Sequence, residues 1–133
     1  MNKNSLIKSR KIKNVNGLDI YIKETKVQKK NGNIILLLHG FPELSYSYRH
    51  IMIMLAKSGY YCIAPDQRGY GKTISKEKSK VSSFSIFNLT KDIYLLSQKL
   101  RIDKFHLVGH DFGSYVSCYF ALLYPDKLLS ITL

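Results

Sequence analysis

The residue best placed to do chemistry in this sequence is Asp111, at the centre of Gly109-His110-Asp111-Phe112-Gly113. A Gly-x-nucleophile-x-Gly run between a strand and a helix forms a tight, strained turn that thrusts the central side chain above a sheet. The backbone N–H groups at the start of the helix favour negative charge at that point. We therefore predict that Asp111 is a nucleophile on a strand-to-helix turn.

An aspartate at this position indicates a particular kind of reaction. A carboxylate needs no general base to become a nucleophile, and it can attack an sp³ carbon to form an ester that water later hydrolyses. Epoxides and alkyl halides are electrophiles of this kind, whereas the substrates of ordinary esterases and proteases are not. The expected partner is therefore a small-molecule electrophile such as an epoxide, and we expect no cofactor and no metal.

Two further loops follow apolar segments in the same way. His39-Gly40-Phe41-Pro42-Glu43 comes after the apolar run 34–38, and Asp66-Gln67-Arg68-Gly69-Tyr70-Gly71 comes shortly after the segment 60–64. Unbroken apolar runs are typical of strands that are covered on both faces. Because ligands bind at the carboxyl ends of the strands in open α/β sheets, we expect all three loops at one edge of a sheet.

The remaining elements alternate between strands and helices. Asn16-Gly17 supplies the positive φ angles of a type I′ turn, so residues 11–15 and 18–23 are expected to form an opening β-hairpin. Apolar spacing predicts the other elements, which are helices over 44–55, 84–100 and 114–124 and strands over 105–108 and 128–133. The Lys/Ser-rich stretch 72–83 is expected to be a long solvated loop. The alternation predicts an α/β fold with a mostly parallel sheet covered on both faces.

Taken in order, the three loops resemble those of the α/β-hydrolases of the epoxide hydrolase and haloalkane dehalogenase group. The resemblance runs from Asn16-Gly17 to the C-terminus. It implies that Asp111 is the nucleophile and that the backbone N–H groups of Phe41 and Phe112 form the oxyanion hole. It also implies that residues 1–133 are the N-terminal part of an α/β-hydrolase core, from strand 1 to the start of strand 6. The cap domain and the C-terminal catalytic part of the family would then lie outside this chain.

The branches of this group differ in the residue that follows the nucleophile. Haloalkane dehalogenases usually hold the halide there with a Trp N–H, and fluoroacetate dehalogenases commonly use an Arg; this chain has Phe112 and no Trp. Epoxide hydrolases also often carry Trp, but in them the backbone N–H matters more than the indole. This elimination favours a hydrolase of the epoxide-hydrolase type, with a dehalogenase-type enzyme as the alternative. A non-catalytic binding protein of the same fold is a further hypothesis, which alkylation of Asp111 would exclude.

We expect no base for Asp111 among the four histidines of the chain. His39 should orient its loop, and His110 should point away from the carboxylate of Asp111. His50 should lie on a helix and His106 within a strand. The resemblance places the water-activating histidine and its acidic partner beyond the sixth strand. We therefore expect a truncated chain that needs a complementary C-terminal segment for turnover.

A nucleotide-binding P-loop is the alternative interpretation of the second loop, since Gly69 to Thr73 ends in the Gly-Lys-Thr of a Walker A motif. That motif also needs a glycine five residues before Gly71, where this chain has Asp66, whose charge would repel phosphate. We therefore expect no tight ATP binding. We expect instead that Asp66 forms a structural ion pair with Arg68.

Composition narrows the remaining partners and the location. The formal net charge is +12, and nine of the 21 basic residues fall between Lys3 and Lys30. No RNP, zinc-finger or helix-turn-helix pattern accompanies this charge, so we expect no nucleic-acid partner. The apolar run 34–38 is far shorter than the roughly 20 residues that span a bilayer, so we expect a cytoplasmic protein without membrane contact. Cys62 and Cys118 are expected to be buried, reduced thiols.

Overall fold

The first two strands form an antiparallel hairpin at one side of the sheet. In the computed structural model, which describes residues 6–133, β1 (Ile7–Val15) and β2 (Leu18–Thr25) pair across Asn16-Gly17. Asn16 has a φ of 51° and Gly17 a φ of 77°, the left-handed values that a two-residue type I′ turn requires. The predicted hairpin is confirmed, and its first strand begins earlier than the prediction placed it.

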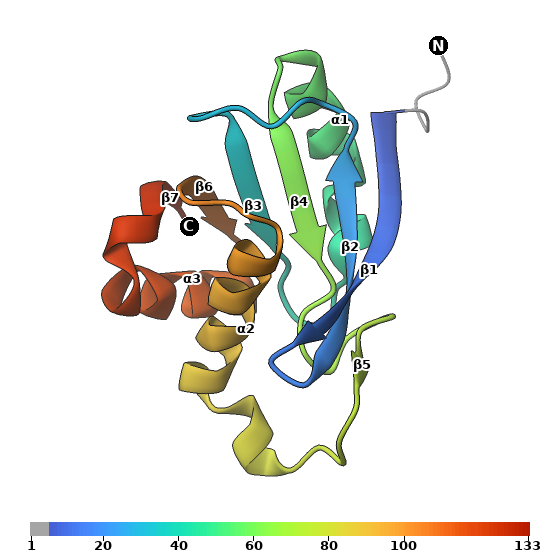
Figure 1. The fold of residues 1–133 in the computed structure, drawn as a ribbon, viewed down its shortest axis with the longest axis vertical. Helices are drawn as coiled ribbons and strands as arrows, with labels where there is room; N and C mark the ends of the chain where they lie inside the picture. Colours follow the sequence, from blue (N-terminus) through green and yellow to red (C-terminus); the bar gives the residue numbers. More distant parts are fainter. Residues whose placement is uncertain (1–5) are drawn as a thin grey trace.

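The sheet continues as four parallel strands. In spatial order these are β4 (Tyr61–Pro65), β3 (Ile34–Leu38), β6 (Phe105–Gly109) and β7 (Leu128–Thr132). β2 joins them through an antiparallel pairing with β4, so the order across the sheet is β1-β2-β4-β3-β6-β7 (Figure 1). The predicted mostly parallel sheet with an opening hairpin is therefore confirmed.

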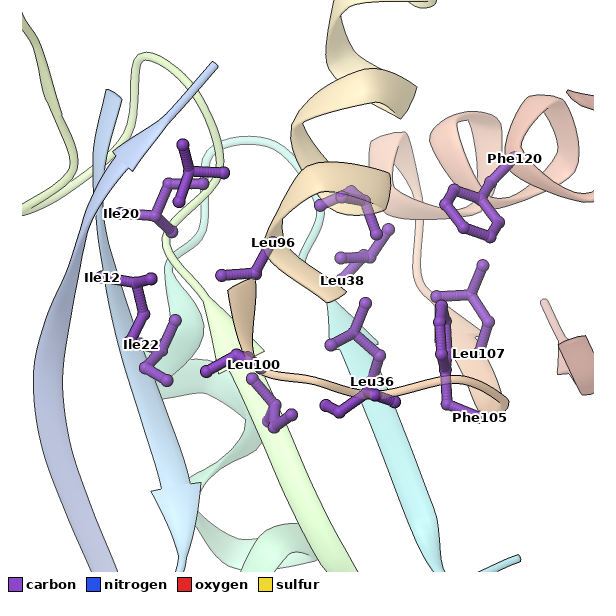
Figure 2. Packing of buried hydrophobic residues seen from close by; sticks show 14 of the residues in the cluster. Ile12, Ile20, Ile22, Leu36, Leu38, Leu96, Leu100, Phe105, Leu107 and Phe120 are labelled. Atoms are coloured by element: carbon purple, nitrogen blue, oxygen red, sulfur yellow. The ribbon is translucent and has the colours of Figure 1, made fainter. Parts of the chain in front are cut away.

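Helices cover both faces of this sheet. α1 (Arg49–Lys57) lies on one face, and α2 (Ile86–Lys99) and α3 (Phe112–Leu123) lie on the other (Figure 1). Neighbouring residues of β3 point to opposite faces of the sheet. Leu36 belongs to the larger apolar cluster, whereas Leu37 belongs to a smaller cluster with Met52 of α1. Figure 2 shows how side chains of the hairpin, the parallel strands and the helices meet in the larger cluster. The run 34–38 is buried on both sides, as its composition indicated.

The stretch 72–83, expected to be a long solvated loop, contains a short strand. β5 (Ile74–Ser75) pairs antiparallel with Leu18 and Asp19 at the start of β2. This part of β2 extends beyond its pairing with β4 and so offers free backbone N–H and C=O groups. No pattern within the Lys/Ser-rich stretch reveals that edge, and the prediction of an unbroken loop is wrong.

Short 3-10 turns lead into α1, α2 and β7. They span Ser45–Tyr48, Val81–Phe84 and Pro125–Lys127. The helices predicted over 44–55 and 84–100 therefore begin later than the apolar spacing indicated. Ser85 caps α2, since its hydroxyl oxygen accepts a hydrogen bond of 3.2 Å from the N–H of Asn88.

A buried ion pair ties the loop after β4 to α2. Nε and Nη2 of Arg68 donate to the two carboxylate oxygens of Asp92 at 2.8 and 2.7 Å. The side-chain amide of Asn16 donates to Asp92 at 2.7 Å and to Asn88 at 2.8 Å, and the Asn16 carbonyl accepts from Arg68. The predicted ion pair between Arg68 and Asp66 is wrong, because the Arg68 side chain turns away from its own loop toward the helix.

The two cysteines of the chain differ in their exposure to solvent. Cys62 is buried and free, as expected, whereas Cys118 is free but exposed, because its position on α3 faces away from the core.

β7 is the outer strand on its side of the sheet, and both Leu129 and Ile131 on it are exposed. Within residues 6–133, no helix has the length and apolar character needed to cross a membrane.

Candidate active site

Asp111 lies in the turn between β6 and α3. Its φ of 55° and ψ of −120° form a backbone conformation that is strained for an L-residue and recurs at functional turns. Flanking glycines make this turn possible: a Cβ on Gly113 would lie 2.1 Å from the carbonyl oxygen of Leu38, and one on Gly109 would lie 2.5 Å from that of Gly113. The motif therefore builds the predicted strand-to-helix turn and leaves the Asp111 side chain exposed at the carboxyl edge of the sheet.

The 39–43 loop lies against this turn. β3 and β6 are neighbours with Leu38 opposite Gly109, so their carboxyl ends bring the two loops together. The backbone N–H of Phe41 donates a hydrogen bond of 2.9 Å to Oδ1 of Asp111. The loop thus has its predicted position, and Phe41 directs its N–H group at the carboxylate.

Backbone N–H groups favour the ionised form of Asp111. Two backbone groups lower the pKa of Asp111 from its ordinary value of 3.8. The hydrogen bond from the N–H of Phe41 has the larger effect, and that from the N–H of Phe112 has the smaller one. A positive charge on His110 acts in the same direction. At neutral pH the site therefore presents an ionised, exposed carboxylate that can attack an electrophile.

His39 supports the loop that carries Phe41. Its Nε2 accepts a hydrogen bond of 3.1 Å from the backbone N–H of Gln67, and the Gln67 side chain donates to the His39 carbonyl at 2.7 Å. Nδ1 lies 2.9 Å from the carbonyl oxygen of Gly40, an arrangement that places the ring hydrogen on Nδ1. Burial lowers the pKa of His39, in agreement with a neutral ring. His39 therefore has the loop-orienting position that we predicted.

The other histidines make no hydrogen bond to Asp111 either. His110 turns toward Glu43, with its Nδ1 3.6 Å from Oε2. His106 is bonded near the start of β6, at the end of the strand away from Asp111, and His50 lies in α1. Among residues 6–133, no histidine is hydrogen-bonded to the Asp111 carboxylate.

The three loops fall within the part of the chain that a known family covers. The profile of the family described as alpha/beta hydrolase fold matches residues 33–133. The chain belongs to this family. The α/β-hydrolase is 40% identical over 118 residues to Epoxide hydrolase 3 of Siraitia grosvenorii, a match that covers 89% of this chain and 35% of that protein. It is 39% identical over 98 residues to Epoxide hydrolase A of Mycobacterium tuberculosis, which covers 74% of this chain and 30% of that protein.

Solved structures share the same fold. The α/β-hydrolase superimposes on an epoxide hydrolase from Vigna radiata with a TM-score of 0.84 and 39% identity, covering 95% of this chain and 39% of that chain. Potato (Solanum tuberosum) epoxide hydrolase I gives a TM-score of 0.84 and 38% identity, covering 94% of this chain and 38% of that chain. The chain thus spans about a third of the length of the curated relatives that it matches, at 35% and 30% of the two named above.

In this α/β-hydrolase, Asp66 shapes the loop after β4 through backbone N–H groups. Its Oδ1 accepts a hydrogen bond from the N–H of Ser45 at 2.9 Å, and its Oδ2 accepts one from the N–H of Lys72 at 3.0 Å. A Cβ on Gly71 would lie 2.2 Å from Oδ2, so the carboxylate fills the inside of the loop. A phosphate group would meet this negative charge, which disfavours the P-loop interpretation.

A hollow of about 280 Å³ opens beside the turn of the α/β-hydrolase that carries Asp111. Its apolar lining consists of Leu89 and four aromatic residues, Phe41, Tyr70, Phe84 and Phe112. The sequence motifs do not single out Tyr70 or Phe84 as site residues. One feature of the sequence could have indicated Tyr70, its place in a loop that follows a parallel strand, whereas Phe84 reaches the hollow only because of how distant elements pack.

Within residues 6–133, no group of three or more His, Cys, Asp or Glu side chains is arranged to hold a metal ion.

Proposed function

We propose that this α/β-hydrolase chain provides the nucleophile of an epoxide hydrolase, and that the nucleophile is Asp111. The observation that carries the proposal is the 2.9 Å hydrogen bond from the Phe41 N–H to Asp111 Oδ1, in a strained and exposed turn. This contact orients an ionised carboxylate while its side chain stays open to a substrate. The relatives named as epoxide hydrolases support the same choice of substrate.

In the first step, a carboxylate oxygen of Asp111 attacks one carbon of the epoxide. The new C–O bond of an ester forms as the ring C–O bond breaks, and the electron pair of the broken bond goes to the epoxide oxygen. That oxygen takes a proton from water or from an acid of the whole protein. The product is a hydroxyalkyl ester of Asp111.

In the second step, water attacks the carbonyl carbon of this ester. We assign the backbone N–H groups of Phe41 and Phe112 to the oxyanion hole that holds the developing negative charge, and such donors are worth about 3 kcal/mol each in comparable enzymes. The bond between the carbonyl carbon and the alkyl oxygen then breaks, and the alkyl oxygen takes the second proton of the attacking water. The diol is released and the carboxylate of Asp111 is restored. The attacking water must lose a proton to a base.

We propose that a complementary C-terminal segment of the whole protein supplies that base and its acidic partner. The proposal rests on the contacts of His39, whose two ring nitrogens are engaged by the loops, and on the direction of His110 toward Glu43. A histidine opposite the ester carbonyl is the usual source of such a base.

Mass spectrometry of the chain after incubation with styrene oxide tests the nucleophile directly. We expect one adduct per chain, located at Asp111 by peptide mapping and absent from Asp111→Asn. Asp103→Asn is the matched control, because Asp103 is a carboxylate whose side chain is 86% exposed and which lies outside the site. Faster modification of Asp111 by 1-bromobutane than by any epoxide would favour the dehalogenase-type alternative. No modification by either reagent would favour a non-catalytic binding protein.

Besides the complementary C-terminal segment, the proposed mechanism requires a small-molecule electrophile as its substrate. The absence of a nucleic-acid partner and the cytoplasmic location stay predictions from the sequence.

A further inference from the structure

The large positive charge of the chain is not explained by the nucleophilic chemistry. Lys and Arg together number 21, against nine Asp and Glu. Part of this charge lines a hollow of about 440 Å³ between the β1–β2 hairpin and α1, which lie beside each other in Figure 1. Its basic side chains are Lys23, Arg49 and His50. Ile7, Ser9, Tyr46 and Ile53 complete the lining of this cationic hollow.

We propose that the cationic hollow binds a phosphate monoester that carries an apolar group. Asp111 and the loop residues around it do not line this hollow. The inference therefore goes beyond the proposed function and does not depend on it.

Local structure brings the lining side chains to one place. Ser9 of β1 lies opposite Lys23 of β2 in the antiparallel register, so the two side chains point to the same face of the sheet. Ile7 precedes Ser9 by two positions and shares this face, where it packs against the smaller apolar cluster beneath α1. Arg49 and Ile53 are four positions apart in α1 and so lie on one side of the helix. The hairpin and the helix thus supply the two walls.

Neutral groups hold the two permanently charged side chains. Nζ of Lys23 lies 3.5 Å from the hydroxyl oxygens of Ser9 and Tyr21. Nη1 of Arg49 donates to the Tyr46 carbonyl at 3.0 Å, and Cζ of Arg49 lies 4.0 Å from the centroid of the Tyr46 ring. Nζ of Lys23 lies 5.9 Å from the same centroid. Side chains that are positioned before binding lose less conformational entropy when a ligand arrives.

No carboxylate neutralises these two charges. Within residues 6–133, neither Lys23 nor Arg49 forms an ion pair, and no Asp or Glu lines the cationic hollow. Arg10 and Arg68, by contrast, each have an acidic partner. Two positive charges held beside one ring repel each other, and an anion bound between them would offset this repulsion.

The charge and the lining of the cationic hollow favour a phosphate monoester. Such a group carries a charge of about −1.5 to −2 at pH 7, which matches Lys23 and Arg49 together, whereas a carboxylate would match only one of them. The planar guanidinium group of Arg49 suits bidentate binding of phosphate oxygens, and Lys23 adds a point charge. Among residues 6–133, the Arg49 guanidinium makes no hydrogen bond other than that to Tyr46, so further N–H donors are available.

Apolar side chains leave room for the group that the phosphate carries. Ile7 and Ile53 are half-buried and line the cationic hollow beside the basic side chains. A cavity of about 150 Å³ is large enough to hold benzene. The volume of about 440 Å³ therefore accommodates an aromatic ring together with its phosphate group.

An NMR titration of the chain with phenyl phosphate tests the proposal. We expect saturable shifts of backbone amide signals at residues 7–9, 23 and 46–53. Inorganic phosphate should bind about tenfold more weakly, because it buries no apolar surface. Benzoate, which keeps the ring but carries one charge, should bind about fivefold more weakly. Binding of either probe as tight as that of phenyl phosphate would overturn the assigned ligand class.

Substitutions in the two walls test the location. Lys23→Met and Arg49→Met should each weaken phenyl phosphate binding by about fivefold. Arg49→Lys, which keeps the charge but loses the planar group, should weaken it less than Arg49→Met. Lys57→Met is the matched control, because Lys57 is an exposed cation of α1 that does not line the cationic hollow.

The proposed function and the cationic hollow can fail separately. Asp111→Asn should bind phenyl phosphate as tightly as the parent, whether or not any epoxide modifies Asp111. Absence of saturable binding would overturn the cationic hollow. So would an equal loss of affinity in Lys57→Met, which would show attraction to the net charge of the chain in place of a defined site.

Discussion

Gly40 and Asp111 are in direct contact at the carboxyl edge of the sheet, since a Cβ on Gly40 would lie 2.6 Å from the Cβ of Asp111 and 2.9 Å from its Oδ1. The loop after β3 and the turn after β6 therefore pack as one unit. This contact also sets the position of the Phe41 N–H, which is the next group along the loop. The carboxylate and its hydrogen-bond donor are thus positioned by the absence of one side chain.

Replacing Gly40 by alanine should displace Asp111 and slow its alkylation. A misplacement of about 1 Å costs about 100-fold in comparable reactions, and we expect a loss of that order in the rate of adduct formation with styrene oxide. Gly32→Ala is the control, because Gly32 has a φ of 87° but nothing within 4 Å of its added Cβ. That variant should lose about 1 kcal/mol of stability through backbone strain and keep the parent rate. Equal rates for Gly40→Ala and the parent would contradict the contact.

The stability of the chain should depend on pH through Glu24 in β2. Burial opposes ionisation of Glu24, but hydrogen bonds from Arg10 and from the Tyr61 hydroxyl outweigh it, so the pKa of Glu24 is lowered from 4.5. A carboxyl group with a lowered pKa in the folded state stabilises the fold above its unfolded pKa and loses this effect as the pH falls through the folded pKa. The Glu24 contribution is therefore present at pH 7 and lost below about pH 4.5.

Urea unfolding of Glu24→Gln against the parent measures this contribution. We expect a loss of about 1 kcal/mol in the free energy of unfolding at pH 7, since the Arg10 partner is half exposed, and a smaller loss at pH 3.5. Asp103→Asn, which changes an exposed carboxylate paired with Lys127 at 3.5 Å, should change the free energy by less than about 0.5 kcal/mol. A loss for Glu24→Gln that does not vary with pH would show that the effect is one of packing.

The buried pair of Arg68 and Asp92 should show strong energetic coupling. Removing one partner leaves a buried charge unpaired, so Asp92→Ala should cost about 3 kcal/mol, whereas adding Arg68→Met to it should restore part of the loss. A double-mutant cycle read by urea unfolding checks this. The parallel cycle of Arg68 with Asp66 should give a smaller coupling energy. The opposite ranking would restore the ion pair that the sequence suggested.

The chain of 133 residues should be alkylated by an epoxide without turning it over. An ester at Asp111 needs a deprotonated water, and the contacts of His39 and His110 direct both rings elsewhere. Mass spectrometry should show a stable adduct, and chromatography of the solution should show less than one diol per chain. Several diols per chain, lost in Asp111→Asn, would mean that one of the four histidines acts as the base.

Sequence patterns locate Asp111, Phe41 and Phe112 because each follows a strand, and the carboxyl ends of parallel strands share one edge. They miss features that depend on how distant elements pack. The partner of Arg68 is on α2, 24 positions away, although an acid lies two positions away in the sequence. Phe84 reaches the hollow beside Asp111 because the 3-10 turn before α2 rests on Gly69, a contact that no local pattern encodes.

The hairpin turn contains Asn16-Gly17, a pair of residues that is prone to slow deamidation. An asparagine followed by glycine loses ammonia readily, because the next backbone nitrogen closes on the side-chain carbonyl without steric hindrance from a Cβ. At Asn16-Gly17, hydrolysis of the resulting cyclic imide by water would leave a carboxylate in place of a donating amide, whose nitrogen lies 2.7 Å from Oδ1 of Asp92. Two neighbouring negative charges repel each other, and Arg68 would be shared between them. Deamidation on the hairpin would thereby weaken the hold of α2 on the loop that carries Tyr70.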